Sequence, residues 1–154
     1  KGVEHRIEYA GERGGVTFYN DSKATSVDAT MKAVEALGEG QGKIVLILGG
    51  RGKNAPYAPL VPLIRSSVRT LVLIGEDADN IESQLSSEAH IIRVADMREA
   101  VEAGYRSAER GDAVLLAPAC ASFDMFKSFE ERGTIFKAEV TRLIHAGAGA
   151  ENAA

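Results

Sequence analysis

Hydroxyl and amine side chains gather in residues 20–25, which read Asn-Asp-Ser-Lys-Ala-Thr. Thr25 is a favourable N-cap for the helical pattern that follows it, with Asp28 three residues further on. The N–H groups at a helix N-terminus attract anions, and Lys23 adds positive charge beside them. The segment is therefore a candidate anion site, although its spacing alone favours a simple capped turn with a solvated lysine.

A glycine-rich segment, residues 49–54, contains an arginine and a lysine. It fails both tests for a nucleotide motif. A Walker A loop needs glycine in place of Ile47 and serine or threonine in place of Asn54, and the dinucleotide-binding fingerprint needs glycine in place of Ala55. What remains is either a flexible cationic turn that grips a carboxylate or phosphate, or a tight turn whose charges are solvated.

A third segment contains three of the chain's five phenylalanines, Phe123, Phe126 and Phe129, within seven residues. So apolar a stretch either packs down as a plug or lines a pocket, and packing is the commoner outcome. Cys120 lies just before it, with no histidine nearby in sequence. A lone cysteine usually behaves as a small hydrophobe, so we do not expect a nucleophile there.

Short apolar runs must position these segments. Continuous apolarity without alternation predicts strands buried on both faces. The runs are residues 44–48, 71–74, 91–94 and 113–117. Helical spacing occurs in three other places. Residues 27–37 form an apolar stripe that Gly38 ends, and residues 136–144 form another. Between them, Asp96 and Glu99 form a variant of the capping box, which predicts that a helix begins there. Strands that alternate with helices predict a parallel sheet with helices on both faces.

The N-terminal part differs, because residues 6–10 and 16–19 flank a glycine-containing turn at 11–15 and predict a hairpin. We therefore expect an α/β, Rossmann-like fold with a mostly parallel sheet and an antiparallel N-terminal hairpin at its edge. Ligands of such sheets bind outside the carboxyl ends of the strands. The three polar or glycine-rich segments should accordingly form one rim.

Composition excludes several functional classes. The 154 residues make one domain, and the net charge of −4, without basic runs, argues against nucleic acid. No apolar run approaches the ~20 residues of a membrane span. A single cysteine favours a reducing cytoplasm. His5, His90 and His145 lack metal-ligand spacing, so no metal site is expected.

Taken together, the motifs resemble the D-glutamate-adding ligases of the Mur ligase family. They are the Asp-Ser-Lys-Ala-Thr segment, Gly-Gly-x-x-Lys at 49–53, Pro-Ala-Cys-Ala-Ser at 118–122, Phe-Glu-Glu-Arg-Gly at 129–133, and His-Arg-x-Glu from His5. The resemblance runs from His5 to about Leu143. It implies a C-terminal, amino-acid-binding domain at residues 1–145 and a flexible tail at 146–154.

The resemblance also implies an activity. The full enzyme would use ATP and Mg²⁺ to activate the carboxyl group of UDP-N-acetylmuramoyl-L-alanine, and would then add D-glutamate in peptidoglycan synthesis. This domain alone would be inactive, would bind no cofactor and would be a monomer. Arg6 and Asp21 would contact ATP, and Lys23 would be catalytic, near both the phosphates and the amino acid. The D-glutamate carboxylates would be held by Thr25, Lys53, Ser122 and the backbone around Phe123 and Phe129.

Two residues depart from the family pattern. Arg51 stands where an acidic residue is common, which leaves Lys53 without an obvious acidic partner, and Ala117 stands where a serine usually precedes the proline. Three alternatives stay open: an amide ligase of other amino-acid specificity, a free-standing nucleotide-binding module, and a non-catalytic interaction domain docked through its phenylalanines.

Overall fold

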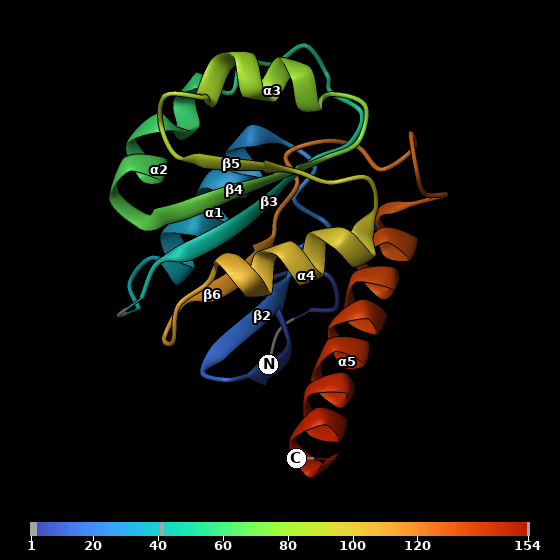
Figure 1. Ribbon diagram of the computed structural model, residues 1–154. Coiled ribbons are helices and arrows are strands. Elements are labelled where there is room, and N and C mark those ends of the chain that lie inside the picture. The colour runs from blue at the N-terminus through green and yellow to red at the C-terminus, as the bar shows by residue number, and fades with distance from the viewer. Residues whose placement is uncertain (1–2, 41, 154) are drawn as a thin grey trace.

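The computed structural model describes residues 3–40 and 42–153. They form a six-stranded sheet in the order β1-β2-β6-β3-β4-β5. Strand β1 pairs antiparallel with β2, and every other neighbouring pair is parallel. The predicted Rossmann-like sheet with an antiparallel N-terminal edge is therefore confirmed (Figure 1).

The strands and helices alternate along most of the chain. The strands are β1 (Glu8–Arg13), β2 (Val16–Asn20), β3 (Ile44–Gly49), β4 (Val68–Ile74), β5 (His90–Arg93) and β6 (Ala113–Leu116). The helices are α1 (Val27–Leu37), α2 (Val61–Ser67), α3 (Ala78–Leu85), α4 (Met97–Ser107) and α5 (Phe129–Ala153), with a 3-10 turn at Ala58–Leu60.

Two apolar layers hold the sheet between its helices. On one face, Leu46 and Leu48 of β3 pack in a cluster with residues of α1, α2 and α3. On the other face, Val45 and Ile47 pack in a cluster with residues of α4 and α5. Figure 1 shows α4 and α5 together on that second side. All six residues of β3 are buried, because side chains that alternate across a central strand meet helices on both faces.

The capping residues are confirmed in one helix and wrong in another. Asp96 accepts from the Glu99 amide, and the Glu99 carboxylate accepts from the Ala95 amide, so the capping box of α4 forms. In α1 the N-cap is Ser26, whose hydroxyl accepts from the Ala29 amide at 3.1 Å. Thr25 therefore does not cap this helix, because the chain turns helical one residue later than predicted.

The strand at residues 91–94 is not buried on both faces as predicted. The corresponding β5 lies at the edge of the sheet, pairs only with β4, and exposes both of its terminal residues. At the C-terminus, α5 continues to Ala153 through residues that we expected to fray. The mobility of residues 146–154 stays a prediction.

Candidate functional site

The three loops singled out in the sequence meet at one edge of the sheet. They follow β2, β3 and β6, which are parallel neighbours in the sheet. The Ala119 amide donates to the Ala24 carbonyl at 2.9 Å, which joins the first loop to the third. Arg51 and Ala121 exchange two backbone hydrogen bonds, at 2.8 and 3.0 Å, which join the second loop to the third. The predicted rim therefore exists as a bonded unit.

Lys53 and Thr25 are in direct contact at this rim. The Lys53 Nζ donates to the Thr25 carbonyl at 2.7 Å, so the lysine of the second loop reaches across to the first. Because Ser26 makes the helix cap, the Thr25 hydroxyl has no capping role. Arg51 instead pairs with Glu76, 3.1 Å away. The charge of Arg51 is thus balanced by a carboxylate, whereas Lys53 contacts a carbonyl.

The third loop separates its phenylalanines. Phe123 is 62% exposed, and Phe126 packs partly buried against the core beneath α4 and α5. Phe129 begins α5; its ring lies edge-on to His5, and its carbonyl accepts from the Ser22 hydroxyl at 2.7 Å. The three rings therefore form no single plug.

Ser122 is buried at the turn of the same loop. Its carbonyl accepts from the amides of Met125 and Phe126, at 3.2 and 2.9 Å. The paired backbone of Arg51 and Ala121 places it directly beside the second loop.

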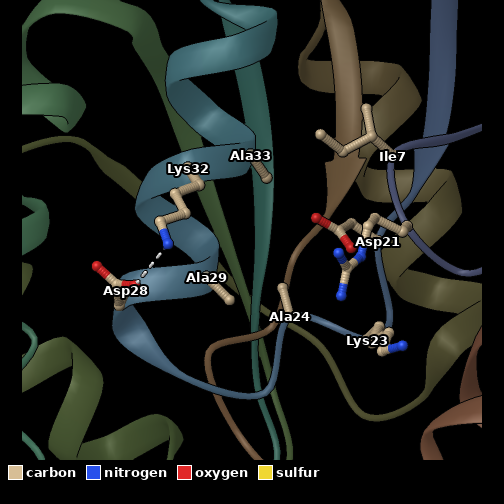
Figure 2. Close-up of a pocket in the computed structure, with 9 residues that line it drawn as sticks. Ile7, Asp21, Lys23, Ala24, Asp28, Ala29, Lys32 and Ala33 are labelled. Atoms are coloured by element: carbon tan, nitrogen blue, oxygen red, sulfur yellow. Dashed lines mark ion pairs between the residues drawn. The ribbon is translucent and has the colours of Figure 1, made fainter.

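A neighbouring cavity of about 220 Å³ gathers the residues that we assigned to ATP (Figure 2). It is lined by Arg6, Ile7, Asp21, Lys23, Ala24, Asp28, Ala29, Lys32 and Ala33. In Figure 2 the Asp28–Lys32 ion pair lies on helix α1 across from Asp21. Thr25, Lys53 and Ser122 are outside this lining. The residues predicted for ATP and those predicted for D-glutamate thus form two adjacent groups, and their roles stay predictions.

Asp21 is the titratable group most perturbed in the cavity. Asp21 is only 5% exposed, and burial raises the pKa of its carboxyl group from 3.8 to about 6. A hydrogen bond from the Ile7 amide and the charge of Arg6 oppose this rise. The carboxyl group is therefore ionised at neutral pH but protonates in mild acid.

The segment that presents Arg6 is held in an unusual backbone conformation. His5 and Ile7, on either side of it, have φ angles of 64° and 43°, in the left-handed region that costs energy for residues other than glycine. His5 is buried, and its Nδ1 lies 2.9 Å from Asn20 Nδ2. The amide of Lys23 donates to the His5 carbonyl at 3.0 Å. Arg6 is thus fixed relative to the first loop.

One cluster of described residues has the composition of a metal site. Glu4, His5 and Glu8 place their ligand atoms within 4.8 Å of one another. Lys137 Nζ, however, contacts the carboxylates of both Glu4 and Glu8, at 2.9 and 3.2 Å. The lysine supplies the positive charge that a metal ion would supply, so these residues do not suit Mg²⁺.

Sequence reasoning missed two buried groups at the rim. Tyr57 donates to the Asp77 carboxylate and lies 3.1 Å from Cys120 Sγ, and burial raises the pKa of that thiol. Burial thus favours the neutral thiol of Cys120, and its lack of a catalytic role stays a prediction. Arg132 is 2% exposed and hydrogen-bonds two of the three loops. A charged residue within Phe-Glu-Glu-Arg-Gly has no sequence signal for burial other than the family motif.

No described helix is long and apolar enough to cross a membrane. Solved structures with the same fold include the UDP-N-acetylmuramate-alanine ligase of Thermotoga maritima, with a TM-score of 0.61, 15% identity, and coverage of 92% of this chain and 31% of that one. They also include the bifunctional folylpolyglutamate synthase/dihydrofolate synthase of Yersinia pestis, with a TM-score of 0.63, 17% identity, and coverage of 89% and 31%.

Curated relatives are much more similar in sequence. A UDP-N-acetylmuramoylalanine--D-glutamate ligase of Pseudomonas savastanoi pv. phaseolicola is 49% identical over 88% of this chain, and one of Acidobacterium capsulatum is 47% identical over 97%. The chain spans only about 30% of the length of these relatives. The family model described as "Mur ligase, glutamate ligase domain" matches residues 5–120. The chain therefore belongs to the Mur ligase family, as its C-terminal, glutamate ligase domain.

Proposed function

We propose that this domain binds D-glutamate for an ATP-dependent ligase that adds it to UDP-N-acetylmuramoyl-L-alanine during peptidoglycan synthesis. The observation that carries the proposal is the bonded rim, where Lys53 spans to Thr25 beside Ser122. D-glutamate offers two carboxylates, and a lysine with hydroxyl donors matches them. The relatives named as D-glutamate ligases support this choice of amino acid.

The adjacent cavity suits one part of a nucleotide. The cavity, of about 220 Å³, would hold one part of the nucleotide, and another domain would cover the rest. Arg6 and Lys23 would place positive charge near the phosphates, and Asp21 would accept hydrogen bonds from hydroxyl groups. When bound, ATP supplies the phosphoryl group that activates the substrate carboxyl. Magnesium would be held outside the described residues, because their one candidate cluster already contains Lys137.

The role of this chain in that reaction is to bind and orient. Lys53 and Thr25 would hold D-glutamate with its amine directed at the activated carboxyl, and Lys23, between the two groups, would stabilise negative charge as the bond forms. We infer that the isolated chain is inactive. Incubated with ATP, Mg²⁺ and D-glutamate, it should release no phosphate above a blank. Measurable turnover would contradict the proposal that this domain only binds and orients substrates.

The decisive experiment uses the full-length ligase and a panel of amino acids. Purified enzyme with ATP, Mg²⁺ and UDP-N-acetylmuramoyl-L-alanine should release phosphate with D-glutamate, and far less with L-glutamate, D-aspartate, L-lysine or meso-diaminopimelate. The product is identified by mass spectrometry. A preference for another amino acid would replace the proposed substrate while leaving the family unchanged.

A further inference from the structure

Arg132 lies in the first turn of α5 and is almost completely buried. Its Nε donates to the Ser22 hydroxyl at 2.9 Å, and its Nη2 donates to the Ser22 carbonyl at 2.7 Å. Its Nη1 donates to the Cys120 carbonyl at 3.0 Å. One planar guanidinium thus joins the loop after β2 to the loop after β6, using donors whose relative directions are fixed.

The second loop closes over the same group. A Cβ atom at Gly50 would lie 3.3 Å from Arg132 Nη1 and 2.3 Å from the Ala121 carbonyl, so only glycine allows this approach. Gly50 also has a φ of 138°, which favours glycine. All three loops of the rim therefore converge on one side chain.

The acceptors of Arg132 are uncharged. A buried cation is costly unless it is paired, and these three bonds go to a hydroxyl and two carbonyls. Burial lowers the pKa of the guanidinium to about 10, so it keeps its charge at neutral pH. Asp124 contributes an attraction, but its Oδ2 accepts from the Glu76 amide and its Oδ1 has no partner among the described residues.

The Ser22 hydroxyl links Arg132 to the start of α5. It accepts from Arg132 and donates to the Phe129 carbonyl at 2.7 Å, so its direction is determined on both sides. Ser22 is three residues before Thr25, and Cys120 is two residues before Ser122. The guanidinium therefore joins the two segments that lead to the hydroxyl residues assigned to the amino acid.

We propose that Arg132 is the positioning residue of the amino-acid site: its guanidinium holds the Thr25 and Ser122 loops at the spacing that a bound dicarboxylate bridges, with positive charge beneath them. This inference rests on the proposed function. A lysine at this position keeps the charge but cannot span both loops, so the planar fork and not the charge alone is required.

The test uses Arg132→Lys in the full-length ligase, with Ser22→Ala as a second variant that keeps the arginine. We expect the KM for the amino acid to rise about ten-fold to a hundred-fold for Arg132→Lys and less for Ser22→Ala, as expected when charge-assisted hydrogen bonds are lost. The KM for UDP-N-acetylmuramoyl-L-alanine should not change. The matched control is Arg142→Met, on the same helix, whose exposed side chain pairs with Glu139 and should leave all constants unchanged.

Hydrogen exchange in the same proteins gives a readout independent of activity. Arg132→Lys should accelerate amide exchange in residues 20–25 and 117–122 while leaving β3 protected. Unchanged KM values in both variants, or acceleration spread evenly over the sheet, would overturn the inference. If the wild-type enzyme does not use D-glutamate, the proposed function fails, and the exchange pattern still decides whether Arg132 orders the two loops.

Discussion

Asp21→Asn should stabilise the chain at neutral pH, because it removes a buried negative charge. The carboxyl group lies on a residue 5% exposed, where burial outweighs the Ile7 hydrogen bond and the Arg6 charge. Asparagine is nearly isosteric, and its carbonyl oxygen can still accept from the Ile7 amide. The substitution therefore changes the charge and keeps the shape.

The magnitude follows from the pKa. A rise from 3.8 to about 6 is about 2 units, and at about 1.4 kcal/mol per unit the ionised carboxylate costs roughly 3 kcal/mol of folding free energy above pH 6. Because the folded state holds this proton more tightly than the unfolded state, the wild-type chain loses stability as pH rises from about 4 to about 6. The gain from Asp21→Asn should be near zero below pH 4 and about 1–3 kcal/mol at pH 7. This corresponds to about 2–4 °C in Tm per kcal/mol.

Urea unfolding of the isolated chain at pH 4, 5, 6 and 7 measures this difference directly. Asp28→Asn is the matched control, because Asp28 is exposed on the opposite wall of the same cavity and its loss should have little effect. A gain for Asp21→Asn that is the same at every pH, or a loss at pH 7, would refute the reasoning. In the full-length ligase the same variant should lower kcat/KM for ATP, so stability and activity should move in opposite directions.

Three further substitutions test the proposed site and the packing of helix α5 behind it. Lys53→Ala in the full-length ligase should raise the KM for D-glutamate about ten-fold to a hundred-fold, the loss of a charge-assisted bond, and leave the KM of the uridine substrate nearly unchanged. Arg6→Ala should reduce kcat/KM for ATP in the same assay, and an unchanged value would remove it from the ATP group. Gly133→Ala should lower the free energy of unfolding of the isolated chain, measured in urea, by about 1–3 kcal/mol, because the new Cβ would overlap His5 Nδ1. Gly40→Ala, whose Cβ would meet the Leu37 carbonyl at 3.4 Å, should change stability by less than about 0.5 kcal/mol.

The fold was predictable because its central strands are unambiguous. Residues 44–48 are apolar without alternation, and β3 is buried at every position. The strand at 91–94 has the same local pattern, yet β5 lies at the edge. Which strand lies outermost depends on the order of the sheet, and that order is set by packing between distant elements rather than by local composition. The cap of α1 was misplaced because Thr25 and Ser26 are both good caps, and backbone geometry chooses between them.

The loops of the site were predictable, but their internal order was not. Parallel strands place their carboxyl ends together, so the rim followed from the topology. Arg132 stands among Phe-Glu-Glu-Arg-Gly, a charged run that on local pattern suits a solvated helix start. Its burial depends on Ser22, 110 residues earlier, and no local pattern encodes so distant a partner.

The separation of Ser22 and Arg132 in the sequence also affects when their contact can form while the chain is being synthesised. All six strands and four of the five described helices are complete before Arg132 is reached, and the last strand, β6, ends sixteen residues before it. A nascent chain can therefore build its whole sheet while the loops at 20–25 and 117–122 still lack the residue that joins them. Contacts between residues so far apart in sequence form late, because closing a long loop costs entropy that only the finished contact repays. We therefore expect the proposed anion-binding rim to be the last part of the domain to form, so that an unfinished chain would present the sheet without a competent site.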